Sequence, residues 1–148
     1  MMFKDIKAAI ISLIRAEVAV NDSWVYDYEP ARPEGYPAIS VTAKSVPARF
    51  ADTERNRREY TFRIRCYQER QTTGTQAGLV SQKEAERILT DLVDSMISVF
   101  DNYANYNLLN QVPNLVFVQP IPADWGYVNA PDIDMRIADI NLVAVVLQ

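Results

Sequence analysis

The sequence predicts an α+β fold, with one mostly antiparallel sheet of about four to five strands packed with two amphipathic helices. Two long segments repeat apolar residues every three or four positions, which is the period of an amphipathic helix. Shorter segments between and after them are rich in β-branched and aromatic residues, as strands are. The chain has 148 residues, 49% of them hydrophobic, and therefore fits one domain over 1–148 that buries its own core.

The first predicted helix runs from about Phe3 to Val20. Its apolar face consists of Phe3, Ile6, Ile10, Leu13, Ile14 and Val18. Asp5, Lys7 and Arg15 interrupt the apolar run, which is therefore unlike a targeting signal or a membrane helix of roughly 18 to 20 apolar residues. We expect no membrane partner and a chain that is assembled in the cytoplasm.

Two strands are predicted next, at Trp24–Tyr28 and Ala38–Ala43. Three prolines and a glycine over residues 29–37 preclude both a helix and a central strand between them. The following segment, Lys44–Asn56, is polar and contains a proline, which predicts a long connection. Connections of this length in a compact domain usually have a function.

The stretch NRREYTFRIRCYQER, residues 56–70, has the clearest strand pattern in the chain, because apolar and polar residues alternate over eight positions. The side chains expected in the core are Tyr60, Phe62, Ile64 and Cys66. The opposite face carries Thr61, Arg63, Arg65 and Tyr67, with Arg57 and Arg58 at the strand entrance. Such a row of guanidinium groups can form bidentate pairs with carboxylates.

The second half of the chain predicts a helix followed by two strands. A flexible loop over 71–78 precedes a capping box at Ser81–Glu84, which opens a helix from about Gln82 to Tyr103. The strands are Asn114–Gln119, which a proline bounds on each side, and Met135–Leu147. The last strand becomes apolar on both faces at its end, which implies a partner on each side. The second partner is either another helix of this chain or another chain.

Between these two strands, Trp125 and Tyr127 fall in a proline-rich excursion. Trp125 is either part of a loop that covers the core or an aromatic anchor in a subunit interface, where tryptophan and tyrosine are enriched. The sequence does not choose between the two.

The residue content argues against most chemistry at a site. The chain has no histidine, four glycines and one cysteine, and it carries no phosphate-binding loop or dinucleotide motif. Cys66 has no histidine to activate it and is expected to be buried and inert. Asp132 and Asp134 could offer two carboxylates to a hard cation, but two acids do not make a metal site. We therefore predict no enzyme, no cofactor and no metal.

The charge is distributed unevenly along the chain. Residues 49–70 contain seven arginines and four acids, while the net charge of the whole chain is −4. A basic strip in an acidic molecule suits contact between copies better than non-specific binding to a polyanion, because the overall field repels phosphates. Tyr67 is the only aromatic residue on the arginine face, which also disfavours binding to single-stranded nucleic acid.

The order and character of these elements resemble the tail terminator, or tail completion, proteins of long-tailed bacteriophages and prophages. The resemblance rests on the amino-terminal amphipathic helix, the strand at Tyr36–Val41, the strand at Arg57–Tyr67, the helix beginning at Glu84–Glu86 and the final apolar strand. It covers almost the whole chain, and it implies a small structural virion protein in the neck that is not an enzyme.

The family resemblance also implies partners. Such a subunit forms a hexameric ring on the head-proximal end of the tail tube, halts tube polymerisation and joins the tail to head-completion proteins, while DNA passes through without specific binding. The loops Lys44–Asn56 and Gln71–Val80 would then contact tube or neck proteins. The alternatives are another head–tail connector, a tail tube subunit, a domain that binds nucleic acid or a small ligand, and an enzyme. The interface residues that we predict are Arg57, Arg58, Arg63, Arg65, Tyr67, Trp125 and Tyr127.

Overall fold

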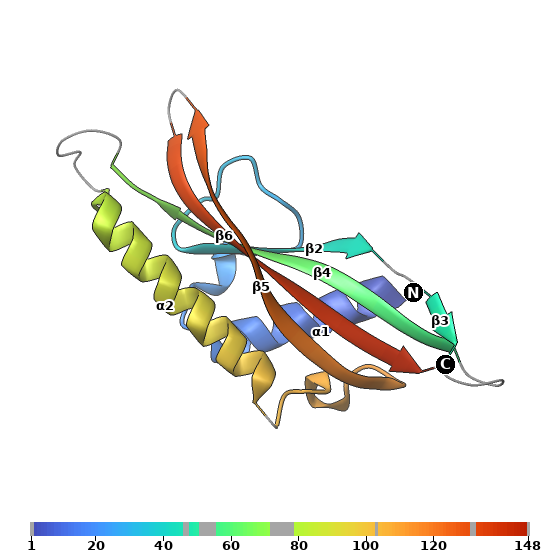
Figure 1. Ribbon diagram of the computed structural model, residues 1–148. Coiled ribbons are helices and arrows are strands. Elements are labelled where there is room, and N and C mark those ends of the chain that lie inside the picture. Colours follow the sequence, from blue (N-terminus) through green and yellow to red (C-terminus); the bar gives the residue numbers. More distant parts are fainter. Residues whose placement is uncertain are drawn as a thin grey trace.

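A computed structural model describes residues 2–45, 48–50, 56–71, 79–102, 104–130 and 133–147 (Figure 1). It confirms the predicted α+β fold, in which one sheet packs with two α-helices. The strands are β1 (Val25–Tyr26), β2 (Ala38–Ser45), β3 (Ala48–Phe50), β4 (Asn56–Glu69), β5 (Leu115–Ala130) and β6 (Ile133–Leu147). The helices are α1 (Met2–Glu17) and α2 (Gln82–Asp101), with two short 3-10 turns, η1 (Asp22–Trp24) and η2 (Leu108–Asn110).

The sheet has the strand order β1-β2-β4-β6-β5, and the short β3 pairs with β4 beside this path. Every neighbouring pair is antiparallel except β1 and β2, which run parallel. The two long strands β5 and β6 form a hairpin, and β5 is one edge of the sheet while β1 is the other. The prediction of a mostly antiparallel sheet is therefore confirmed.

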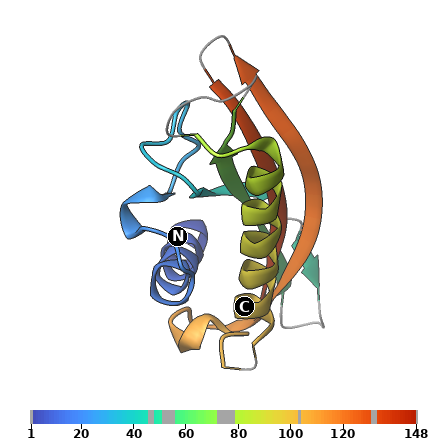
Figure 2. The same ribbon diagram turned by 90° about the vertical axis from the view of Figure 1, so that its left-hand side faces the viewer.

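Both α-helices lie on one face of the sheet, which we call the helix face (Figure 2). The main core forms between them and alternate residues of the strands, as the sequence pattern predicted. The largest fully buried side chains of this core include Ile6, Ile10, Ile14, Phe62, Ile64, Leu89, Met96, Phe100 and Ile140. Cys66 belongs to the same core and is fully buried, as expected.

The opposite face of the sheet, which we call the outer face, carries a second, smaller cluster. Ala38, Tyr67 and Met135 are its buried members, and side chains from the segment after η1, including Tyr36, pack against them. Cys66 and Tyr67 are neighbours in β4 but belong to different clusters, because successive side chains of a strand point to opposite faces.

No helix in the described part of the chain is long and apolar enough to cross a membrane.

The predicted helix starts are accurate and the helix ends are less so. The Ser81 side chain caps α2, since its Oγ accepts a hydrogen bond from the backbone N–H of Glu84 at 3.1 Å. The helix ends at Asp101, and Tyr103 lies outside the described residues. α1 ends at Glu17, three residues before the predicted end, although Val18 still packs in the core.

The predicted connection at Lys44–Asn56 is partly wrong. β2 continues to Ser45, β3 occupies Ala48–Phe50, and β4 already begins at Asn56. Because β4 is longer than its apolar pattern, it offers backbone groups that β3 pairs with, and this long-range pairing leaves no signal in the local sequence. Residues 51–55, like the predicted loop residues 72–78, lie outside the described part.

The predicted end of a strand at Gln119 is also wrong. β5 continues through Pro120 and Pro122 to Ala130, so Trp125 and Tyr127 lie on a strand rather than in an excursion. Proline removes a backbone donor, but an edge strand has one side without a pairing partner, where a missing N–H costs no ladder hydrogen bond.

Candidate interaction surface

The predicted row of arginines lies on the outer face of the sheet, and its carboxylate partners are in the same chain. Arg65 stands opposite Asp139 in the β4–β6 register. Its Nε and Nη2 donate to the two Asp139 carboxylate oxygens at 2.8 and 3.0 Å. Arg63 Nη1 lies 3.3 Å from Glu29 Oε1, in the segment that follows β1. The sequence predicts that Arg63 and Arg65 meet carboxylates of a neighbouring copy, whereas the structure shows carboxylate partners for both within one copy.

The Arg65–Asp139 contact is a planar, bidentate ion pair. The exposed fractions of the two side chains are 21% and 11%. The hydrogen bond to Asp139 holds the pKa of the Arg65 guanidinium above its ordinary value, although burial opposes this. The pair fixes both side chains and leaves little unpaired positive charge for a phosphate to neutralise.

Tyr67 lies on the same face but presents almost no surface. It is 4% exposed and its hydroxyl lies 3.0 Å from the hydroxyl of Ser40. Burial raises the pKa of the Tyr67 hydroxyl, while the hydrogen bond with Ser40 opposes the increase. In the single copy, Tyr67 thus contributes to the outer-face cluster and not to a contact surface.

Arg57 and Arg58 occupy opposite faces by their register, so they cannot both extend the arginine row. Arg57 pairs with Leu147 and Arg58 with Val146, and Val146 belongs to the main core on the helix face. The Nε of Arg58 is buried and has no hydrogen-bond partner among the described residues. The side chain of Arg57 lies outside the described part.

Trp125 and Tyr127 are exposed on the edge strand β5. Their exposed fractions are 39% and 53%, and the role of Trp125 as an interface anchor stays a prediction. Both rings contact Arg136 of β6, whose Cζ lies 5.1 Å from the centroid of Trp125 and 4.4 Å from that of Tyr127. Arg136 Nε in turn donates to Glu86 of α2 at 2.7 Å. The helix thus fixes the arginine, and the arginine orders the two rings.

Arg70, just after β4, holds Tyr127 from another direction. Its Cζ lies 4.4 Å from the Tyr127 ring, and its Nε donates to Asp134 Oδ1 at 3.2 Å. Its backbone N–H also donates to the Asp134 carbonyl, which ties this segment to the start of β6. We call Arg70, Trp125, Tyr127 and Arg136 the arginine–aromatic cluster. The two aromatic residues are predicted contact residues from the sequence, but nothing local singles out Arg70 and Arg136, because their neighbours are set by the hairpin register.

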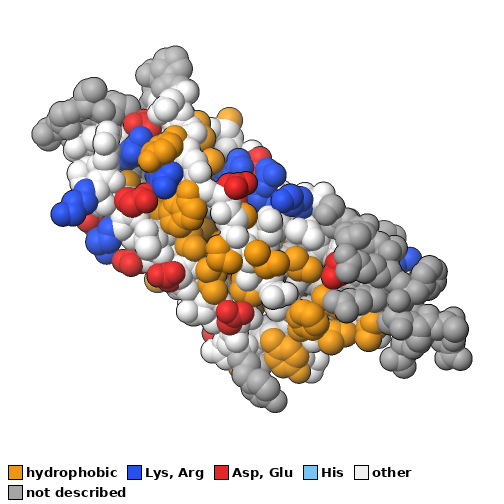
Figure 3. All heavy atoms as spheres, viewed as in Figure 1, with side chains coloured by type: hydrophobic (Ala, Val, Ile, Leu, Met, Phe, Trp, Pro, Cys, Tyr) orange, Lys and Arg blue, Asp and Glu red, His pale blue; other side chains and the backbone are white. Residues whose placement is uncertain are grey.

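Hydrophobic side chains continue along this edge of the molecule. Figure 3 shows them as a band over β5 and β6. Val116 and Ile121 of β5 are 39% and 42% exposed, in addition to the two aromatic residues. Both α-helices pack on the helix face, and Val145, on the outer face of the apolar end of β6, is 4% exposed in the single copy. Another chain as a second partner of this end stays a prediction.

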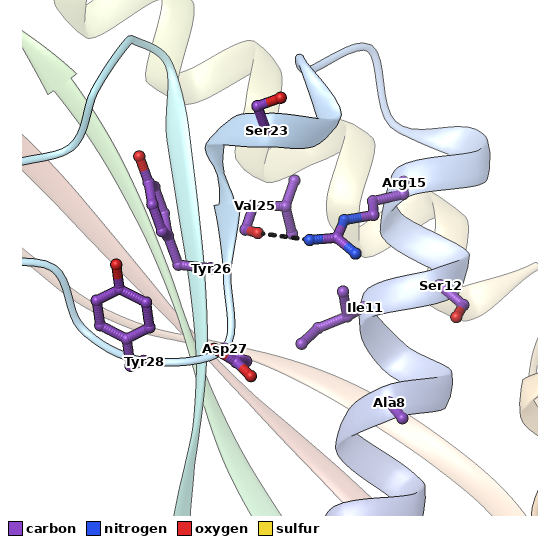
Figure 4. A pocket seen from close by; sticks show the side chains of 9 residues that line it. All are labelled: Ala8, Ile11, Ser12, Arg15, Ser23, Val25, Tyr26, Asp27 and Tyr28. Carbon is purple, nitrogen blue, oxygen red and sulfur yellow. Dashed lines mark hydrogen bonds between the residues drawn. The ribbon is translucent and has the colours of Figure 1, made fainter.

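The opposite edge of the sheet carries a hollow of about 500 Å³ between α1 and β1 (Figure 4). The side chains that line it are Ala8, Ile11, Ser12, Arg15, Ser23, Val25, Tyr26, Asp27 and Tyr28. Two basic side chains of α1 reach across to backbone oxygens at this edge. Arg15 Nη2 donates to the Val25 carbonyl and Lys7 Nζ to the Asp27 carbonyl, both at 3.0 Å.

The thiol and the carboxylate that could carry chemistry both have structural roles in the described part of the chain. Burial raises the pKa of the Cys66 thiol to about 12, so the thiol is protonated and shielded at neutral pH. Asp134 forms an ion pair with Arg70, and Asp132 lies outside the described residues. The described side chains contain no group of three or more potential metal ligands.

The described surface at β5 therefore combines exposed rings with arginines that are paired to carboxylates. No protein-family model matches the chain, and no curated protein matches it. Among solved structures, it is similar to a chain of the virion of a native gene transfer agent (GTA) particle. The two share 18% sequence identity with a TM-score of 0.62, over 99% of this chain and 97% of the other. This likeness shows a common fold along the whole length.

Proposed function

We propose that this chain is a structural subunit of a phage-type virion, and within it a tail terminator. It would form a ring, hexameric by the family resemblance, that caps the head-proximal end of the tail tube, stops tube polymerisation and joins tail to head. The observation that carries this proposal is the fold shared over 99% of this chain with a chain of a GTA virion. The sequence resemblance to tail terminators points independently to the same class.

The two edges of the sheet support a subunit that does not add further copies by strand pairing. Pro120 and Pro122 cannot donate hydrogen bonds from β5 to an added strand. At β1, the Val25 carbonyl already accepts from Arg15 and the neighbouring Asp27 carbonyl from Lys7. Strand addition is thus hindered at these positions of both edges, so we expect copies of the chain to meet through side chains at defined contacts.

The paired arginines support a ring that DNA traverses without specific binding. Arg63 and Arg65 are neutralised by Glu29 and Asp139 in the same copy. A gel-shift assay with duplex DNA is therefore expected to give no shift at physiological salt. A shift by the monomer that weakens as salt rises would instead favour a nucleic-acid-binding domain.

The partners of the proposed ring are further copies of the chain, the tail tube protein and the head-completion proteins. Its location is the neck of the virion, after assembly in the host cytoplasm. The stretches 44–56 and 71–80 remain the candidates for contact with tube or neck proteins. β3 occupies part of the first stretch, which reduces the length available for such a contact.

Electron microscopy of particles made without this protein tests the proposal. Overlong tails that are not joined to heads are expected for a missing terminator, and supplying the chain in trans restores normal particles. Unjoined tails of normal length would indicate a head–tail connector, and an absence of tubes would indicate a tube subunit. Normal infectious particles would contradict a virion role altogether.

Sizing by light scattering tests the ring directly. The expected result is a hexamer, or a monomer that becomes hexameric when purified tail tubes are added. A chain that stays monomeric in both conditions would contradict the ring.

A further inference from the structure

Two features lie at opposite edges of the sheet, a pair of projecting rings and a hollow. Trp125 and Tyr127 project from β5, and the hollow lies beside β1. The strand order separates these edges by the full width of the sheet, and Figure 2 shows α1 and β5 on opposite sides of the molecule. One copy cannot bring the two features together, but two copies can.

Contacts within a single copy already hold the rings of Trp125 and Tyr127 in place. Arg136 contacts both rings and is held by Glu86, while Arg70 contacts Tyr127 and is held by Asp134. Fixing these rings in advance lowers the entropy lost on binding. Each arginine has its own carboxylate, so the surface is electrically balanced and selects a protein partner rather than a polyanion.

The hollow offers the reciprocal features. Its volume of about 500 Å³ is within the range of roughly 300 to 1,000 Å³ that is typical of binding pockets. Tyr28 is 57% exposed and Ala8 is exposed on α1, so these two residues supply apolar surface, and Asp27 lies at the same site. The indole N–H of tryptophan is only a donor, and a carboxylate such as that of Asp27 is only an acceptor. Among the described contacts Asp27 uses its backbone oxygen, which leaves the carboxylate for such a donor.

We propose that Trp125 and Tyr127 of one copy insert into the hollow between α1 and β1 of the next copy. The inference rests on the proposed function, because it names the contact by which the ring would form. The two surfaces differ, so the contact is heterologous and joins copies head to tail, which closes into a ring when the rotation between neighbours allows it. Trp125 Nε1 donates to the Asp27 carboxylate of the neighbour, and the two rings cover Ala8 and Tyr28.

A chemical cross-link tests which surfaces meet. A double variant, Asp124→Cys with Ser12→Cys, keeps Trp125 and places one thiol beside it and one in the hollow. Treating its assembled ring with a short bis-maleimide is expected to give a ladder of multimers on a denaturing gel. The native Cys66 is fully buried and provides a silent background.

The single variants are the controls for the ladder. A head-to-tail contact gives no cross-link with either cysteine alone, because each contact then holds one thiol. Dimers from Asp124→Cys alone would show that like surfaces meet, and would overturn the inference. A double variant that assembles without any ladder would overturn it too.

Two further variants test the contact from each side. Trp125→Ala removes the projecting ring, and Ala8→Trp fills the hollow from an exposed position of α1. Each is expected to weaken assembly about tenfold or more, as loss of a central anchor does. Ile121→Ala, an exposed position on the same strand but on the outer face, is the matched control and should assemble normally.

Mixing the two defective variants gives a distinctive result. The Ala8→Trp chain still has its projecting rings and the Trp125→Ala chain still has its hollow, so they form one contact and stop at a dimer. Circular dichroism of each variant confirms that the fold is retained. If each variant alone formed rings as well as the wild-type chain, the proposed contact would be overturned and the terminator proposal would stay intact. A wild-type chain that forms no ring even on tail tubes would overturn both.

Discussion

Arg65 shows why a basic stretch in a sequence need not produce a basic surface. Its guanidinium group is paired in bidentate fashion with Asp139, and Glu29 lies within 3.9 Å of it as well. Asp139 is 9% exposed, so the pair connects β4 and β6 in a partly dehydrated setting. Removing one partner of such an ion pair costs more stability than in open solvent, because it leaves a partly buried charge without compensation.

Asp139→Asn is therefore expected to lower the free energy of unfolding by about 1 to 3 kcal/mol. The amide keeps the shape of the side chain but provides one acceptor and no charge for Arg65. Urea unfolding followed by circular dichroism measures the loss. Asp94→Asn is the control, because Asp94 is exposed on α2. An equal effect of both variants would show that the Arg65 pair adds nothing beyond an exposed acid.

The face and the spacing of the arginines could be predicted from the sequence, but their partners could not. Alternation over Tyr60–Tyr67 assigns Arg63 and Arg65 to the face opposite Cys66, and the structure agrees. Asp139 lies 74 residues after Arg65, and nothing local marks it out among the 19 acidic residues. The choice between a partner in the same chain and one in a neighbour needs the register of β6 on β4.

At the scale of elements, α2 connects the core to the candidate surface. One side of the helix buries Leu89, Met96 and Phe100, and its exposed first turns carry Glu86, which binds Arg136. The position of Glu86 depends on where the helix begins. The Ser81 cap at that point therefore affects both the stability of the helix and the order of the arginine–aromatic cluster.

Removing the cap by Ser81→Ala is expected to lower the free energy of unfolding by about 1 kcal/mol, because the N–H of Glu84 loses its acceptor. Thermal or urea denaturation gives the value. Ser95→Ala is the matched control, since Ser95 is exposed in the middle of the same helix and alanine is the better helix former. If both variants behaved alike, helix propensity rather than capping would explain the result.

Elements with a strong local pattern were predictable, whereas those defined by pairing were not. The capping box and the apolar period located α2, and alternation located the centre of β4. β3 and the second half of β5 were missed because proline and polar residues normally end a strand. Their strand conformation comes from β4 and β6, which lie beside them. Trp125 could thus be named as a contact residue, but its setting could not be foreseen.

At the scale of the whole molecule, burial of ionisable groups gives the fold a sensitivity to alkaline pH. Burial raises the pKa of both the Cys66 thiol and the Tyr36 hydroxyl to about 12. In the unfolded chain these groups lose their protons at lower pH, the thiol near 9 and the hydroxyl near 10. The folded state then holds more protons than the unfolded state, so its stability falls as pH rises from about 9 toward 12.

The free energy of unfolding is expected to be flat near pH 7 to 8 and to fall above pH 9, with Cys66 contributing up to about 1.4 kcal/mol per pH unit. Urea titrations at pH 8, 9, 10 and 10.5 measure this slope. Cys66→Ala lowers stability somewhat at every pH but should flatten the alkaline slope. An unchanged slope in that variant would show that Cys66 does not cause the decline.

The hairpin of β5 and β6 has a mechanical consequence. Its strands have 16 and 15 residues and extend over roughly 50 Å, whereas the 20 residues of α2 extend over about 30 Å. The turn end of the hairpin reaches beyond the start of α2 (Figure 1), and Trp125 and Tyr127 lie toward this end. The hairpin is therefore a lever arm: a small tilt of the sheet becomes a large displacement at its tip, and a load applied to the tip is carried back into the core as torque.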